Sequence, residues 1–194
     1  MAKFLRRPSP GDSDALARGP VSDGASPGSA GAAEPPAVAA AFLRKLDILR
    51  DKPRKLRLLK AIGPGQRPWV PLVFLELLAD PCEEIREAAV RQLAGRSDWP
   101  ADALYPRFRR PPWFVKSASL RLAGLRKDAF AVARIRAVLD DANVEVRRMA
   151  AWALGEIGGS EARTLLVRLS KDPSAYVRAA AAEAIDRICD FKFT

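Results

Sequence analysis

Apolar residues recur at steps of three and four positions through most of the chain after residue 37. In VAAAFLRKLDIL, residues 38–49, this spacing puts Val38, Phe42, Leu46 and Leu49 on one side of a helix. Four later stretches share the spacing: 69–79, about 101–108, 128–139 and 161–170. The pattern predicts an all-α domain over residues 38–194, in which Ser160 caps the last of these helices.

A second set of helices follows a recurring motif, which reads Asp, four residues, an aliphatic residue and then a basic residue. Its copies start at 51, 80, 110, 141 and 172, which places them 29, 30, 31 and 31 residues apart. A fixed period of this size indicates stacked supersecondary units. Together with the helix before each motif, the sequence predicts an α-solenoid of five helix pairs.

Small residues dominate the apolar face of the helix that follows each motif. In the last copy this face comprises Val177, Ala180, Ala181, Ala184, Ile185 and Ile188. Alanine lets neighbouring helix pairs approach closely, so we expect stacking to bury one continuous apolar seam.

Residues 1–37 have a different composition. From Pro8 to Pro36, 16 of 29 residues are Pro, Gly or Ser, and only Leu16 and Val21 are sizeable apolar residues. Such a segment buries too little surface to offset its ordering entropy, so we predict a disordered tail. Its charges sum to zero, and the net charge of +10 therefore lies on the predicted domain and favours acidic partners.

The residues that usually carry chemistry are scarce. The sequence has no His, which removes the commonest general base and metal ligand. Cys82 and Cys189 lie far apart, without the spacing of a zinc site. No apolar run approaches the roughly 18 residues of a membrane span, and no secretory signal is recognisable. We predict a cytoplasmic, non-enzymatic protein without a cofactor.

The motif copies at 141 and 172, DANVEVRRMAAWALGEIGG and DPSAYVRAAAAEAIDRI, resemble HEAT repeats. They are similar to the short kind, of roughly 30 residues, found in phycobilisome bilin lyases. The resemblance covers residues 40–194 and is weakest in the first and third repeats. It implies an armadillo-like helical solenoid but no particular function, because such repeats serve many proteins.

The resemblance also implies a ladder of Asp and Arg residues that hydrogen-bond along the stack. It assigns four pairs to this ladder: Asp51 and Arg57, Asp80 and Arg86, Asp141 and Arg147, and Asp172 and Arg178. We expect each Asp to cap a helix as well, with Pro81 and Pro173 at the first helical position. The third copy has Arg110 in place of Asp, so we expect Arg110 and Lys116 to lack an acidic partner and to contact a ligand.

Three kinds of protein with similar repeats suggest activities to test against the sequence. Deoxyhypusine hydroxylases hold iron with His-Glu pairs, which excludes that activity for a chain without His. HEAT-like DNA glycosylases use a basic face with Trp and Asp, and no residue-by-residue match to them is found. Bilin lyases work as paired subunits around a tetrapyrrole, and no residue here singles out a bilin.

Two basic stretches are candidate binding surfaces. Residues 44–67 carry nine Lys or Arg among leucines, typical of amphipathic helices with a solvated basic face. The second stretch, YPRFRRPPWFVK at 105–116, continues to Arg126 and Lys127. Its arginines, including Arg107 and Arg109, alternate with aromatic residues, a pattern that suits phosphates and stacked bases. Alternatively, these aromatic residues belong to the core.

Trp152 is the other candidate. At 100° per residue from Val146 it lies about 240° round its helix, near the edge of the face opposite the core. We expect Arg121 and Arg148 to flank an exposed indole, a composition typical of interface hot spots. The alternative is that Trp152 fills the groove between repeats four and five.

Three functional hypotheses follow. The first is a scaffold that presents a basic face to a protein partner, with seven binding residues: Trp152, Arg148, Arg121, Lys116, Arg110, Arg109 and Arg107. The second is a nucleic-acid-binding solenoid that uses the region 105–127. The third, which rests on the resemblance alone, is an auxiliary subunit of a bilin lyase or a similar cofactor-attachment enzyme.

Overall fold

The computed structural model describes residues 37–49, 51–63 and 67–190, all within the compact unit Glu34–Thr194. The predicted tail, residues 1–37, lies outside the described residues except for its last position, which begins the first helix. The disorder of the tail and the predicted domain boundary at residue 38 therefore stay predictions.

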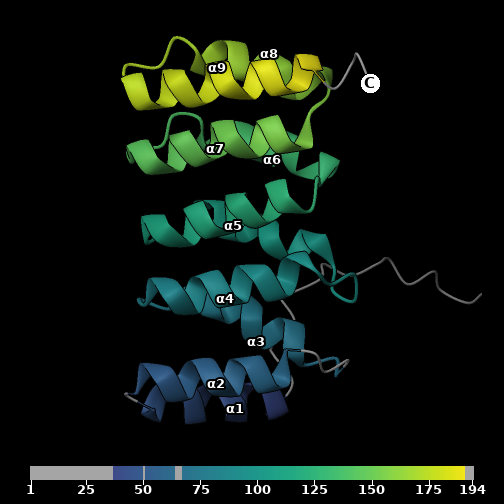
Figure 1. The fold of residues 1–194 in the computed structure, drawn as a ribbon, viewed down its shortest axis with the longest axis vertical. Coiled ribbons are helices and arrows are strands. Elements are labelled where there is room, and N and C mark those ends of the chain that lie inside the picture. Colours follow the sequence, from purple (N-terminus) through teal and green to yellow (C-terminus); the bar gives the residue numbers. More distant parts are fainter. Residues whose placement is uncertain (1–36, 50, 64–66, 191–194) are drawn as a thin grey trace, which may run out of the picture. The chain divides into compact units, whose positions relative to one another are not determined.

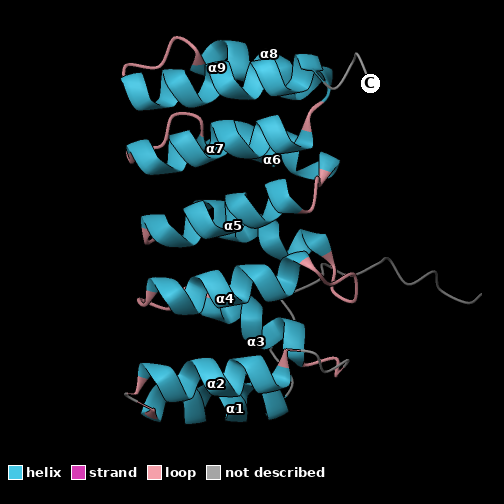
Figure 2. Ribbon diagram, viewed as in Figure 1, coloured by secondary structure: helices cyan, strands magenta, loops and turns pink. Residues whose placement is uncertain are grey.

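Every regular element in the described ranges is helical (Figure 2). The first helices of the five predicted pairs are α1 (Ala37–Ile48), α3 (Val70–Leu77), η1 (Ala101–Arg109), an interrupted helix of η2 (Ala129–Ala131), α6 (Val132–Ile135) and η3 (Arg136–Val138), and α8 (Gly159–Leu169). The second helices are α2 (Lys52–Ile62), α4 (Glu83–Ala94), α5 (Trp113–Leu125), α7 (Val144–Ile157) and α9 (Ala175–Asp190). The prediction of five helix pairs and an all-α solenoid is confirmed.

The second helices lie one above another in chain order, and the first helices form a layer behind them (Figure 1). Helix α5 packs along α7, and α7 packs along α9. Between the layers, α3 packs on α4, η1 on α5 and α8 on α9. None of the described helices is long and apolar enough to cross a membrane.

The first helix of the third pair departs from regular α geometry. Residues 101–109 form a 3₁₀ helix that contains Pro106. Proline lacks a backbone N–H and collides with the carbonyl four residues earlier, so the segment cannot continue as an α-helix. Leu104 and Phe108 are nevertheless fully buried, so the predicted apolar face of this segment is correct.

Close contact between repeats depends on small residues at two positions. A Cβ atom added to Gly155 of α7 would lie 2.6 Å from the Ala184 Cβ of α9. A Cβ added to Gly124 of α5 would lie 2.8 Å from the Trp152 ring of α7. Ala153, Ala181 and their apolar neighbours are fully buried. The small residues therefore allow the close approach that the sequence predicts.

The implied charged ladder is present in the C-terminal repeats. Arg147 donates from Nε and Nη2 to both carboxylate oxygens of Asp172, at 2.8 and 3.1 Å. The hydrogen bond from Arg147 lowers the pKa of Asp172. Arg147 also donates from Nη1 to the carbonyl of Asp141, six residues earlier, at 2.6 Å. In the first repeat Lys55, rather than Arg57, faces the next repeat, 3.9 Å from Asp80.

The predicted helix caps of α4, α7 and α9 are wrong by two residues, whereas Asp51 does lie at the N-cap of α2, without a side-chain cap hydrogen bond. Helices α4 and α7 have Cys82 and Asn143 at their N-caps, so the motif Asp precedes the cap. The Asp80 carboxylate instead accepts from the Cys82 backbone N–H at 2.8 Å, which closes a turn before the helix. Pro81 and Pro173 therefore precede their helices instead of occupying the first helical position.

Ser160 is not a cap either. Helix α8 begins at Gly159 after Gly158, whose φ of 75° suits glycine. Gly158 therefore makes the turn that separates α7 from α8.

Candidate functional site

A groove of about 260 Å³ crosses the second-helix layer over α4, α5 and α7. Two of the predicted binding residues, Arg121 and Arg148, line it. We call this feature the central groove; its other side chains used below are Glu83, Arg86, Glu87, Trp113, Phe114, Glu145 and Met149. The groove is the place where the structure brings predicted binding residues together with an exposed aromatic ring.

Trp113 supplies the exposed apolar surface of the central groove. It begins α5 and is 45% exposed. Its ring meets the edge of Phe114 at a centroid distance of 6.0 Å. Phe114 is covered in turn by the Arg86 guanidinium, 4.5 Å above its ring. Trp113 is therefore fixed at its base by an aromatic contact and accessible above it.

The arginines of the groove are paired with carboxylates. Arg148 donates from Nε and Nη2 to both carboxylate oxygens of Glu145, at 2.8 and 2.6 Å. These hydrogen bonds raise the pKa of Arg148. Arg121 forms an ion pair with Glu87. With Arg86 and Glu83 added, three arginines face three glutamates. The prediction of a basic face does not hold for the central groove, because its charges balance.

The contacts of Arg86 differ from those of its counterparts because position 110 is not an Asp. Its counterparts one and two repeats on, Lys116 and Arg147, reach an Asp of the following repeat. Arg110 stands where that Asp would be, so the Arg86 guanidinium lies over Phe114 instead. The interruption of the ladder therefore places an arginine and an aromatic ring in the groove.

The expectation that Arg110 and Lys116 lack acids is wrong. Lys116 donates to Asp141 of the next repeat at 2.6 Å. Burial raises the pKa of Asp141, but the bond from Lys116, the Asn143 backbone N–H and the nearby charges together lower it. Arg110 lies 3.6 Å from Glu76 of α3. Lys116 thus continues the ladder, and Arg110 pairs with an acidic residue of the preceding repeat.

The arginines of η1 lie apart from the central groove. Arg107 is mostly buried and donates to the Ala103 carbonyl at 2.7 Å and to Glu76 at 2.6 Å. Burial lowers its pKa. Arg109 is exposed and lines none of the groove. Arg107 therefore ties η1 to the second repeat, and a binding role for Arg107, Arg109 and Arg110 stays a prediction.

Trp152 is partly buried, so its interpretation as an exposed indole is wrong. Its ring packs against the core and lies against Gly124 of α5, between repeats three and four. Arg121 and Arg148, its expected neighbours, pair with Glu87 and Glu145 instead. The ring is covered although Trp152 lies away from the core side of its helix, because Gly124 of α5 has no side chain and leaves room for it. A contribution of Trp152 to binding stays a prediction.

Most aromatic residues of the stretch 105–116 do not form a stacking surface. Phe108 is 1% exposed. Tyr105 donates its hydroxyl to Asp128 at 2.9 Å, and Arg134 lies 4.9 Å from its ring centroid. Burial and the bond to Asp128 raise the pKa of Tyr105 to about 12. Among the aromatic residues of this stretch only Trp113 is exposed, which supports the alternative that the others are structural.

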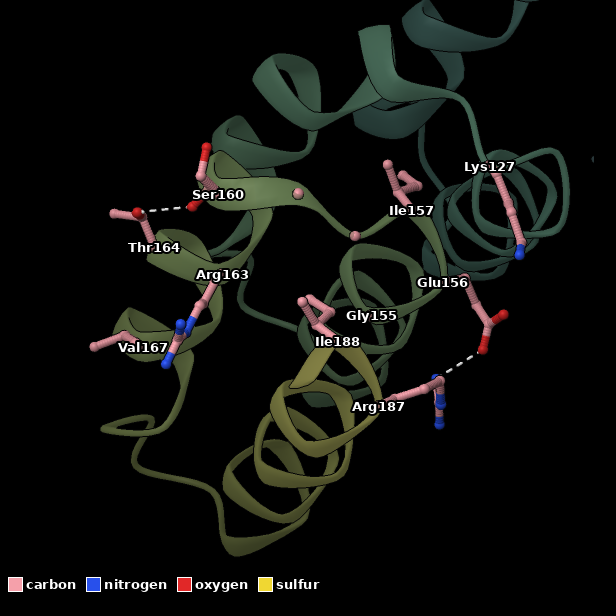
Figure 3. Close-up of a pocket in the computed structure, with 12 residues that line it drawn as sticks. Lys127, Gly155, Glu156, Ile157, Ser160, Arg163, Thr164, Val167, Arg187 and Ile188 are labelled. Carbon is pink, nitrogen blue, oxygen red and sulfur yellow. Dashed lines mark hydrogen bonds and ion pairs between the residues drawn. The ribbon is translucent and has the colours of Figure 1, made fainter. Parts of the chain in front are cut away.

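A second pocket, of about 620 Å³, surrounds the Gly158–Gly159 turn between α7, α8 and α9 (Figure 3). Arg187 of α9 reaches Glu156 of α7 at 2.7 Å beside it, and Ile157 and Ile188 line it. None of the predicted binding residues lines this pocket. In the described residues no cluster of Cys, Asp and Glu could hold a metal ion.

Residues 101–186, from η1 into α9, match the family of HEAT repeats. These residues are HEAT repeats. The match covers the third, fourth and fifth helix pairs, which include the α5 and α7 walls of the central groove. A comparison with curated proteins gives no match.

Two solved structures share the HEAT-repeat fold with this chain. Human deoxyhypusine hydroxylase in complex with glycerol has a TM-score of 0.52 and 21% identity, over 77% of this chain and 63% of the hydroxylase. The complex of CpcE and CpcF of phycocyanin lyase from Nostoc sp. PCC7120 has a TM-score of 0.54 and 20% identity, over 84% of this chain and 68% of that chain. The chain thus spans less than two thirds of the hydroxylase.

Sequence reasoning missed the acidic half of the groove. The Glu145–Arg148 pair has helical i, i+3 spacing and could have been recognised from the sequence. Glu87 and Arg121 are 34 residues apart, and only the stacking of α4 on α5 brings them together. The exposed Trp113 was included in the basic-aromatic stretch, but nothing in the sequence distinguishes it from its buried aromatic neighbours.

Proposed function

We propose that this HEAT-repeat chain is a non-enzymatic scaffold that holds a segment of a protein partner in the central groove. The supporting observation is an exposed Trp113 among balanced charges. Trp is a preferred anchor of protein interfaces, and paired charges around it suit a partner with side chains of both signs. A segment with one large apolar side chain and flanking charges fits this composition.

Nucleic acid is the less favoured ligand for the groove. A phosphate backbone would approach Glu83, Glu87 and Glu145 as well as the arginines, and so would gain little from neutralisation. The aromatic residues expected to stack on bases are largely engaged in the fold. The similarity to CpcE and CpcF extends to the fold, so the hypothesis of a bilin-lyase subunit gains no supporting residue from it.

The proposal can be tested without a known partner by selecting peptides from a displayed random library on the full chain. We expect selected peptides to share one large apolar residue between charges of both signs. Trp113→Ala should weaken their binding at least about tenfold, the usual effect of removing an interface anchor. Isothermal titration calorimetry measures the loss.

Phe130→Ala provides the matched control, because Phe130 is also an exposed aromatic, 79% accessible, but lies on η2 outside the groove. It should leave peptide binding unchanged. Equal losses in both variants, or peptides that bind Trp113→Ala as well as the unaltered chain, would contradict the proposal. A steep loss of oligonucleotide binding with salt, dependent on Trp113, would favour the nucleic-acid hypothesis instead.

A further inference from the structure

The outer face of α9 retains part of the surface through which repeats stack. In α7, Ala151 is fully buried where α9 packs on it, and Arg147 binds the Asp of the next repeat. The equivalent residues 31 positions later, Ala182 and Arg178, are both exposed. In the described residues, α9 thus carries a stacking surface with nothing packed on it.

The same outer face differs from a repeat interface in its charge. Position 155 is a glycine in α7 and allows close contact, but its equivalent in α9 is Asp186, which is exposed. Glu183 lies on another side of the helix, toward α7, where its charge helps to raise the pKa of Arg148. A partner on the outer face of α9 therefore needs a cation opposite Asp186 and an acid near Arg178.

The first described helix pair offers the complementary charges. On α2, Leu59 is buried, and Arg54, Arg57 and Leu58 are exposed on the outer side of the helix. Asp51 precedes α2, and its ion pair with Arg54, at 3.3 Å, is an exposed contact on the surface. It stands at the motif position whose counterpart, Asp172, accepts an arginine from the preceding repeat.

We propose that copies of this chain associate head to tail, with the outer face of α9 in one copy against the outer face of α2 in the next. Arg178 then meets Asp51, which continues the ladder seen between Arg147 and Asp172. Asp186 meets the basic side of α2, and Ala182 packs beside Leu58. Such a contact is heterologous, so an assembly that does not close into a ring keeps a free α9 face at one end and a free α2 face at the other.

Sedimentation velocity of the full chain over a range of concentrations tests the proposal. We expect the mass to rise with concentration and to fall with added salt, since the contact is between opposite charges. Ala182→Arg with Asp186→Arg should weaken association at least about tenfold, and so should Arg54→Glu with Arg57→Glu. A mixture of these two double variants should associate again, because their altered ends are complementary.

Arg91→Glu with Arg136→Glu changes the net charge as much as the α2 variant does, at exposed positions outside both end faces. It should not weaken association. A chain that stays monomeric at every concentration overturns the proposal. Association that survives both end-face reversals, or a mixture of reversed variants that stays monomeric, overturns it as well.

Discussion

At the scale of single residues, the charged side chains divide into those that hold the stack and those that surround an accessible ring. Lys116 and Arg147 belong to the first group, because each reaches an Asp of the following repeat. Arg121 and Arg148 belong to the second, around Trp113. The same residue types serve both purposes, so residue identity alone could not separate them.

Asp172→Asn tests the ladder. Both partners of the Arg147–Asp172 pair are largely buried, with side chains 11% and 4% exposed. Removing one charge should lower the free energy of unfolding by roughly 3 kcal/mol, the low end for breaking a buried pair. Asp140→Asn, in the exposed pair with Arg168, should cost about 1 kcal/mol or less. Urea denaturation measures both, and equal losses would contradict a structural ladder.

The pH dependence of this difference follows from the lowered pKa of Asp172. The ionised carboxylate stabilises the fold above its unfolded pKa of about 3.9. That stability is lost as the pH falls through the lower folded value. The difference in the free energy of unfolding between the unaltered chain and Asp172→Asn should therefore be largest near neutral pH and should become smaller below about pH 4.

At the scale of helices, the spacing of α7 and α9 depends on Gly155. Gly155→Ala would place a methyl group 2.6 Å from the Ala184 Cβ and 3.0 Å from its Cα, so the helices must move apart. We expect a loss of roughly 1–3 kcal/mol, the usual cost of overpacking. Gly95→Ala is the control, because its nearest contact would be 3.9 Å away. A calorimetric unfolding midpoint as high in Gly155→Ala as in Gly95→Ala would contradict this close approach.

The sequence predicted the helices well where periodicity and stacking agree. The second helices α4, α7 and α9 begin three residues after the motif Asp, and their alanine faces are buried as expected. It could not place the caps of these three helices, because an Asp that closes a turn and an Asp that caps a helix have similar surroundings in sequence. It also misjudged Trp152, since the space for its ring is made by Gly124 in another repeat.

At the scale of the whole molecule, the described residues form one stack of helices. The proposed partner site lies on the second-helix side of this stack, rather than in a cavity with reactive groups. The central groove spans three successive second helices, which no single repeat could provide. The proposed head-to-tail contact uses the ends of the stack and leaves the groove uncovered. Partner binding and self-association are therefore separable by mutation.

Photo-crosslinking tests the central claim most directly. A diazirine replaces the large apolar side chain of a selected peptide, and mass spectrometry locates its attachment on the full chain. We expect crosslinks at Trp113 and Met149, in the central groove, and their loss when unlabelled peptide is added in excess. Crosslinks at Phe130, around the Gly158–Gly159 pocket, or spread over the surface without competition would contradict the assignment of the groove as the partner site.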